Sequence, residues 1–209
     1  MEVHRPSDGA LIGRHFFERE PVVCARELVG AILRWGRRAG MVVETEAYDA
    51  EGDEACHTFH RPTARAFVAG HRAGSAYVYL NYGMHWMLNV LAKGRRSGFV
   101  LIRAIEPMRG LAGMRRARGV ASLTELCSGP GKLARALGVD GSHHGIDLCS
   151  PGCRGFSVGP PVAAVACGPR IGISRAKELE WRFLMPGNPH VSGAGRKEKA
   201  GRTLEVRPA

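Results

Sequence analysis

Two carboxylates lie two residues apart in a segment that otherwise has the composition of a buried strand. The segment reads Val-Glu-Thr-Glu-Ala-Tyr over residues 43–48, so the two acids are Glu44 and Glu46. Burying a carboxylate costs free energy unless a cation or hydrogen-bond donors compensate it. A compensated glutamate in a cleft could act as a general base that takes a proton from water. The alternative is that both acids lie at the exposed edge of the strand.

A cationic partner is available in a second apolar run, which Arg103 interrupts. If that run is a strand, alternation places Arg103 on one face with Phe99, Leu101 and Ile105. A buried arginine needs a carboxylate, and Glu46 is a candidate. Such a pair could be a structural ion pair, or it could hold a water for Glu46 to activate. The residues alone leave both interpretations open.

The tyrosines are few and unevenly placed. The chain has four, of which Tyr77, Tyr79 and Tyr82 fall within six residues, and Tyr48 lies two residues after Glu46. Core strands also use tyrosine, so a structural role is one interpretation. In a basic protein, Tyr82 at the tip of a hairpin would also suit a side chain that wedges into duplex DNA in place of an extruded base.

Histidines and cysteines raise the question of a metal. His57 follows an acidic loop and is close to His60, so it could be a surface residue or a ligand, although the spacing matches no common ligand pattern. The six cysteines are scattered, and only Cys149 and Cys153 are closely spaced. Two histidines just upstream make a zinc site conceivable, but again without a common spacing. We expect buried free thiols and no metal.

The elements that must position these side chains begin with a helix. Pro21 stands in its first turn, and Val22, Ala25, Val29 and Ile32 follow at helical spacing. A five-residue turn over 36–40 then leads into a strand over 41–48. Alternation predicts two faces for this strand: Val42, Glu44, Glu46 and Tyr48 on one, and Met41, Val43, Thr45 and Ala47 on the other.

Further along, β-branched and aromatic runs predict three consecutive strands over 76–82, 85–92 and 99–105, the first two joined at Tyr82-Gly83-Met84. A basic helix is expected over 108–118. Another should open within 128–133, with Ser128 as its N-cap and Pro130 in its first turn. Strands are expected near 162–166, 170–173 and 181–185. Because the strands cluster, we predict an α+β fold with a largely antiparallel sheet.

Charge points to a polyanionic partner. Thirty Lys and Arg against nineteen Asp and Glu give a net charge of +11. Nucleic acid, phosphorylated metabolites or an anionic membrane would each fit. The basic residues are spread over several segments, which suits a duplex better than a small anion pocket. No run of 18 apolar residues or signal peptide is visible, so we expect a cytoplasmic, nucleoid-associated protein that does not bind membranes.

Six motifs in order carry a resemblance to a known family. They are Val-Glu-Thr-Glu-Ala-Tyr at 43–48, Asp-Glu-Ala-Cys-His at 53–57, Tyr-Val-Tyr-Leu-Asn-Tyr-Gly-Met at 77–84, Leu-Asn-Val at 88–90, Leu-Ile-Arg-Ala-Ile-Glu-Pro at 101–107 and Leu-Cys-Ser-Gly-Pro-Gly-Lys-Leu at 126–133. Together they resemble the alkyladenine (3-methyladenine) DNA glycosylase family, from about Leu11 to Ser192. The order and spacing are far more specific than any one motif.

The resemblance implies a single domain with a curved antiparallel sheet, flanking helices and a protruding hairpin that inserts into DNA. It implies a monomer without a cofactor that removes alkylated and deaminated purines, such as 3-methyladenine, hypoxanthine and ethenoadenine, from duplex DNA by base flipping. It would do so without a lyase step, because no lysine stands where a nucleophile is needed. We expect an N-terminal extension over 1–10, the glycosylase domain over 11–192 and a basic, flexible tail over 193–209.

The resemblance also implies residue roles. The catalytic residues would be Glu46 as general base, Arg103 holding the water, and the backbone carbonyl of Ile171 as the third contact of that water. The base pocket would be formed by Tyr48, His57 and Tyr79, with the His57 main-chain N–H reading the base and Asn89 excluding the 2-amino group of guanine. The residues inserted into DNA would be Tyr82 and Met84.

Two departures stand beside the resemblance. The segment Arg61–Ala66 reads Arg-Pro-Thr-Ala-Arg-Ala where the family usually has Thr-Pro-Arg-Asn, and Cys56 is unusual before His57. Two rival functions remain. One is a non-catalytic nucleic-acid module, because the fold is also like the RNA-binding C-terminal domain of methionyl-tRNA formyltransferases. The other is a metal- or thiol-dependent hydrolase built on the cysteines and histidines.

Overall fold

The computed structural model describes residues 9–193 and 203–205. Its strands are β1 (Ile32–Trp35), β2 (Arg38–Asp49), β3 (Ala76–Asn81), β4 (His85–Lys93), β5 (Ser97–Arg109), β6 (Arg154–Ser157), β7 (Ala164–Gly168), β8 (Arg182–Leu184) and β9 (Thr203–Glu205). Its helices are α1 (Arg14–Phe17), α2 (Pro21–Glu27), α3 (His57–His60), α4 (Pro62–Gly70), α5 (Leu111–Arg118), α6 (Leu123–Leu126), α7 (Pro130–Leu137) and a 3₁₀ turn, η1 (Gly141–His143).

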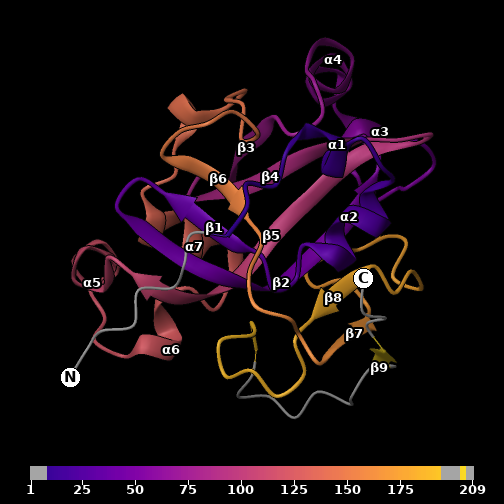
Figure 1. Ribbon diagram of the computed structural model, residues 1–209. Coiled ribbons are helices and arrows are strands. Elements are labelled where there is room, and N and C mark those ends of the chain that lie inside the picture. The colour runs from indigo at the N-terminus through magenta and orange to yellow at the C-terminus, as the bar shows by residue number, and fades with distance from the viewer. Residues whose placement is uncertain (1–8, 194–202, 206–209) are drawn as a thin grey trace.

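The strands of the described chain form one curved antiparallel sheet (Figure 1). The order is β3-β4-β5-β2-β8-β7-β9, and β1 pairs with both β2 and β6. The long strands β2 and β5 run through its middle, so β2 has β5 along one edge and β1 and then β8 along the other. The prediction of a single α+β domain with a largely antiparallel sheet is confirmed. Helix bundles and parallel α/β folds are excluded.

One face of the sheet carries the main core. Large buried side chains such as Leu28, Ile102 and Leu133 join α2, the sheet and α7 in one apolar cluster. The hydroxyl of Thr45 on β2 donates to the carbonyl of Ala25 on α2 over 2.7 Å, which fixes the helix on this face. A second, smaller cluster around Phe67 and Phe99 lies under α4. The middle of β2 is therefore held rigidly from one side.

Three register shifts interrupt the pairing of β2 with β5, and the two next to Glu44 are bulges. Val42 pairs with Ile105, Glu44 with Ala104 and Thr45 with Ile102, so that Val43 and Arg103 have no opposite residue. Each bulge changes which face the following side chains occupy.

The predicted faces are therefore wrong in part. Val42 lies in the main core with Ala47, away from Glu44, and Val43 packs in a separate cluster with Ala104 and Val191. Ile105 likewise lies in the main core and does not share a face with Arg103.

Several element boundaries also differ from the prediction. Helix α2 ends at Glu27, because Gly30 adopts a left-handed φ of 96° and the chain turns into β1; Val29 and Ile32 therefore lie outside the helix. The turn before β2 has two residues, 36–37, and not five. Residues 108–109 extend β5, so the basic helix starts only at 111.

Two later predictions are wrong. Ser128 does not cap α7: the N-cap is Gly129, without a side-chain hydrogen bond, although Pro130 does occupy the first turn. Residues 170–173 are not a strand but a loop. No sequence pattern predicts α3, α4 or β6; α3 and β6 have four residues each, which is too few to show a periodicity.

The turn between β3 and β4 presents exposed side chains. Tyr82 and Gly83 both have positive φ, at 50° and 68°, and the N–H of Met84 donates to the carbonyl of Asn81 over 3.0 Å. Positive φ is uncommon for a tyrosine. The exposed fractions of Tyr82 and Met84 are 83% and 71%, which is unusual for large apolar side chains and typical of a contact surface.

The predicted N-terminal extension and tail fall mostly outside the described residues. Within the tail, β9 is described and pairs with β7. None of the helices in the described ranges is long and apolar enough to cross a membrane.

Candidate active site

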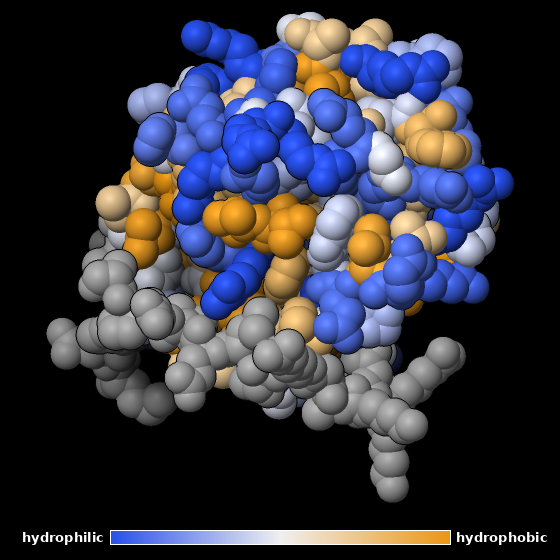
Figure 2. Space-filling view, turned by 90° about the vertical axis from the view of Figure 1, so that its right-hand side faces the viewer, coloured by the Kyte–Doolittle hydropathy of each residue, from blue (hydrophilic) through white to orange (hydrophobic). Residues whose placement is uncertain are grey.

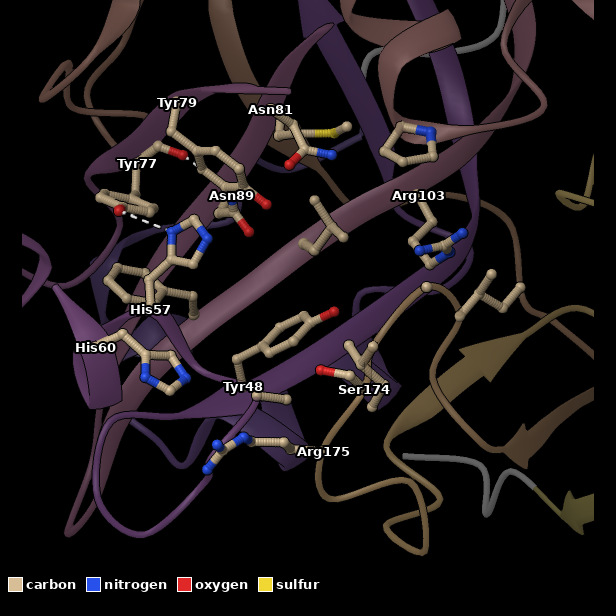
Figure 3. A pocket seen from close by; sticks show the side chains of 18 of the residues that line it. Tyr48, His57, His60, Tyr77, Tyr79, Asn81, Asn89, Arg103, Ser174 and Arg175 are labelled. Carbon is tan, nitrogen blue, oxygen red and sulfur yellow. Dashed lines mark hydrogen bonds between the residues drawn. The ribbon is translucent and has the colours of Figure 1, made fainter. Parts of the chain in front are cut away.

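A cavity of about 420 Å³ opens on the face of the sheet away from the main core, between β2, the β3–β4 pair and the loop after β7 (Figure 3). Its size is in the range of small-ligand pockets. It is lined by most of the residues that the sequence singled out, namely Tyr48, His57, Tyr79, Tyr82, Asn89, Arg103 and Ile171. Residues from six separate segments therefore converge on one place.

Glu46 is fully buried beside this cavity, and three donors satisfy its carboxylate. Arg103 Nη1 and the Tyr48 hydroxyl donate to Oε2 over 3.1 and 2.7 Å. The backbone N–H of Ile171 donates to Oε1 over 2.7 Å. The Glu46–Arg103 ion pair inferred from the sequence is present, whereas the observed contact of Ile171 is its N–H. Because all three donors line the cavity, Glu46 is one side chain away from it.

Glu44 belongs to a different network. It accepts hydrogen bonds from Arg182 Nε over 2.6 Å, from the N–H and Oγ of Ser192 over 2.7 and 2.8 Å, and from Arg103 Nε over 3.2 Å. Every donor is buried, and Glu44 does not line the cavity. Its contacts are those of a structural residue that holds Arg103 from behind.

Aromatic rings form the walls. His57 and Tyr79 lie edge to face with centroids 4.2 Å apart, and Tyr48 lies across the cavity from them (Figure 3). Burial raises the pKa of Tyr79 to about 12, and burial together with the neighbouring Glu46 carboxylate raises the pKa of Tyr48 well above its ordinary value. Burial, and then the charge of Arg61, lower the pKa of His57 to about 4. At neutral pH the walls are therefore uncharged, with both phenols protonated.

Asn89 and Tyr77 are fixed at the inner end. The Asn89 amide nitrogen donates to the carbonyl of Tyr77 over 3.0 Å, while Asn89 lines the cavity. The Tyr77 hydroxyl lies 3.1 Å from His57 Nδ1, so the ring of His57 is held in place. Tyr77 has no role in the expectations from sequence, although its alternation with Tyr79 predicts that it lies on this face.

The two residues that are expected to insert into DNA differ in position. Tyr82 lines the mouth of the cavity, whereas Met84 does not line it.

Sequence reasoning also missed Asp53 and Arg170, which form a fully buried ion pair behind Tyr48, with Nη1 of the arginine 2.6 Å from Oδ2 of the aspartate. The partners are far apart in the chain, and no local pattern marks them.

The two sequence departures have structural counterparts. Residues 62–70 form α4, beginning at Pro62, and the guanidinium of Arg65 donates to the carbonyl of Thr58. Cys56 is buried, and the Thr58 hydroxyl donates a hydrogen bond to its sulfur over 3.2 Å. Within the described ranges, the cysteines are free, and no three His, Cys, Asp or Glu residues are grouped to hold a metal ion.

Comparison with known proteins gives a consistent result. Residues 15–189 match the family model described as methylpurine-DNA glycosylase (MPG). A protein of Rhodopseudomonas palustris (strain BisB18) named "Putative 3-methyladenine DNA glycosylase" is 46% identical over 88% of this chain and 92% of its own length. A protein of Nitrosospira multiformis with the same name is 44% identical over 84% of this chain and 91% of its own.

Proposed function

We propose a substrate class for this chain, which belongs to the methylpurine-DNA glycosylase family and is a DNA glycosylase. It removes alkylated and deaminated purines of the 3-methyladenine, hypoxanthine and ethenoadenine class. It acts as a monomer on duplex DNA, flips the damaged nucleotide out of the helix and starts base excision repair. The observation that carries this proposal is Glu46, buried next to an aromatic cavity with a guanidinium and a backbone N–H on its carboxylate.

Glu46 is the proposed general base. A water bound between Glu46, Arg103 and the backbone of Ile171, whose carbonyl is the third contact, attacks C1′ of the flipped nucleotide. The C1′–N9 bond breaks, its electron pair leaves with the purine, and Glu46 takes the proton of the water. The carboxylate also stabilises the oxocarbenium-like sugar of the transition state. Its proximity to the cavity and its fixed donors suit both tasks.

The cavity walls suit a flipped purine. Tyr48 would stack on one side of the base, and His57 and Tyr79 on the other, with the His57 main-chain N–H contacting its edge. The uncharged rings accept neutral bases by stacking and cationic alkylated bases by cation–π attraction. Asn89 at the inner end would exclude the 2-amino group of guanine. Selectivity then comes from fit and from the weaker glycosidic bond of damaged purines.

The exposed turn suits the duplex. Tyr82 and Met84 would fill the gap that the extruded base leaves, as apolar wedges do in other minor-groove binders. The exposure of Tyr82 and its position at the mouth of the cavity support this role. The positive charge of the chain, +11, would supply the sequence-independent attraction to phosphates.

The test is release of free base from duplexes that carry hypoxanthine, ethenoadenine or 3-methyladenine. The wild-type protein should release at least one of them, and Glu46→Gln should reduce the single-turnover rate by about 100-fold or more. Glu125→Gln, an exposed change on α6, serves as the matched control and should keep the wild-type rate. Undiminished release by Glu46→Gln would refute the mechanism. DNA binding without release of any lesion would favour the non-catalytic module.

The proposed chemistry is that of a monofunctional enzyme. No lysine lines the cavity among the residues that the structure describes, so a Schiff base has no nucleophile there. Borohydride added during turnover should therefore trap no covalent protein–DNA adduct. A trapped adduct would contradict the water mechanism.

A further inference from the structure

Arg170 is a heavily engaged side chain that the proposed chemistry leaves without a role. Its side chain is fully buried, and it is absent from the cavity wall. Its two terminal nitrogens donate to Asp53 Oδ2 and Oδ1 over 2.6 and 2.9 Å, in a bidentate pair. They also donate to the backbone carbonyls of Ala47 over 2.9 Å and Ala176 over 3.3 Å. Arginine supplies this fork geometry, and lysine does not.

The guanidinium also backs a wall of the cavity. It lies over the ring of Tyr48 at 4.7 Å from the centroid and over Trp181 at 5.3 Å. Because Tyr48 lines the cavity and Arg170 does not, Arg170 supports the ring from the side away from the base. A stacked guanidinium and the carbonyl of Ala47 together fix where β2 presents this ring.

The partner Asp53 organises the opposite wall. Its oxygens accept the N–H groups of Asp49 over 3.2 Å and Ala55 over 3.0 Å, and its carbonyl accepts the N–H of Cys56 over 2.9 Å. This loop leads directly into His57. The position of His57 relative to Tyr48 therefore depends on where Asp53 is held, and Arg170 holds it.

The third connection runs along the backbone. The residue after Arg170 is Ile171, whose N–H donates to Glu46 over 2.7 Å. The loop that carries this N–H is tied at Arg170 to β2 through Ala47 and to its own return segment through Ala176. A shift of Arg170 would move a donor of the proposed base and both walls of the pocket together.

We propose that Arg170 is a positioning residue of the glycosylase reaction, which sets the Ile171 N–H on Glu46 and the spacing between Tyr48 and His57 through one buried side chain. The inference rests on the proposed function. Loss of reactive geometry by about 1 Å can cost on the order of 100-fold in rate without loss of binding. Arg170 should therefore affect the bond-breaking step far more than affinity for DNA.

The test compares Arg170→Lys with Arg14→Lys. Arg14 forms a partly exposed arginine–aspartate pair, 2.6 Å from Asp147 and remote from the cavity, so its variant controls for the general effect of exchanging a paired arginine for lysine. The assay uses a duplex that carries hypoxanthine, enzyme in excess over DNA, and a temperature well below the melting temperatures of the two variants. Under these conditions Arg170→Lys should lower the single-turnover rate by about 10- to 100-fold. Its affinity for the duplex should stay within about 2-fold of the wild type. Arg14→Lys should keep the wild-type rate.

Asp53→Asn makes the same test while leaving the stacked guanidinium in place, and it should lower the rate in the same direction. Fluorescence of ethenoadenine in the bound duplex, read before excision, should change in both site variants because the base sits differently between the walls. Equal rates and equal fluorescence for Arg170→Lys, Asp53→Asn and Arg14→Lys would overturn the inference. The proposed function would still stand in that case if Glu46→Gln abolishes release. If the wild type releases no base, the proposed function fails and the inference falls with it.

Discussion

Replacing His57 with glutamine should make the free energy of unfolding less dependent on pH below about pH 6.5. The unfolded imidazole has an ordinary pKa of 6.5, whereas burial and the charge of Arg61 lower the folded pKa to about 4. Between these values the unfolded chain binds a proton that the folded protein does not. The contribution of His57 to the free energy of unfolding is therefore fully present above pH 6.5 and is lost as the pH falls towards 4. At 1.36 kcal/mol per pH unit, the loss is at most about 3 kcal/mol, because one side of the ring faces the cavity.

The measurement is urea unfolding of the wild type and His57→Gln at several values between pH 4 and 7.5. The free energy of unfolding of the wild type should fall by up to about 3 kcal/mol more than that of the variant over this range. The difference at pH 7.5 measures the lost contacts, including the one with Tyr77, and is subtracted as a constant. Parallel profiles would refute the reasoning. The excision rate of the wild type should likewise show no His57 titration near pH 6.5.

Three further substitutions test other parts of the structure. Tyr82→Ala should lower the excision rate while changing the free energy of unfolding by less than about 0.5 kcal/mol, because the side chain is 83% exposed; an unchanged rate would contradict its wedge role. Glu44→Gln should destabilise the protein by about 3–5 kcal/mol in urea, since it removes the charge that two buried arginines share. Gly98→Ala would place its Cβ 2.1 Å from the Tyr48 carbonyl, so it should lower both the melting temperature and the excision rate; normal values of both would show that β5 can move freely there.

The parts of the site on regular strands could be predicted from the sequence. Glu44, Glu46 and Tyr48 do share a face of β2, because alternation is intact after the bulge. Tyr79 could be placed by the same alternation on β3. Tyr82 could be placed because it lies in a turn whose short length limits its geometry. The roles came from the resemblance, because alternation alone gives two equivalent acids.

The parts that failed depend on contacts between distant segments. Residues 170–173 are predicted as a strand, yet they form a loop, which brings the Ile171 N–H to Glu46. Asp53 and Arg170 are 117 residues apart in the chain, and their pairing has no periodic signature. Bulges likewise have no signature in the sequence, since one extra residue hardly changes the composition of a strand.

The bulge at Arg103 explains why the site has two acids. Arg103 is the unpaired residue between the Glu44–Ala104 and Thr45–Ile102 pairs, so its guanidinium reaches Glu44 through Nε and Glu46 through Nη1. In an unbroken ladder it would lie directly opposite Glu44. Arg182 supplies the second positive charge, so two carboxylates and two guanidiniums balance in a buried space. Glu44 thus fixes Arg103 without facing the cavity, and Glu46 has a rigidly held cation beside it for its proposed role as general base.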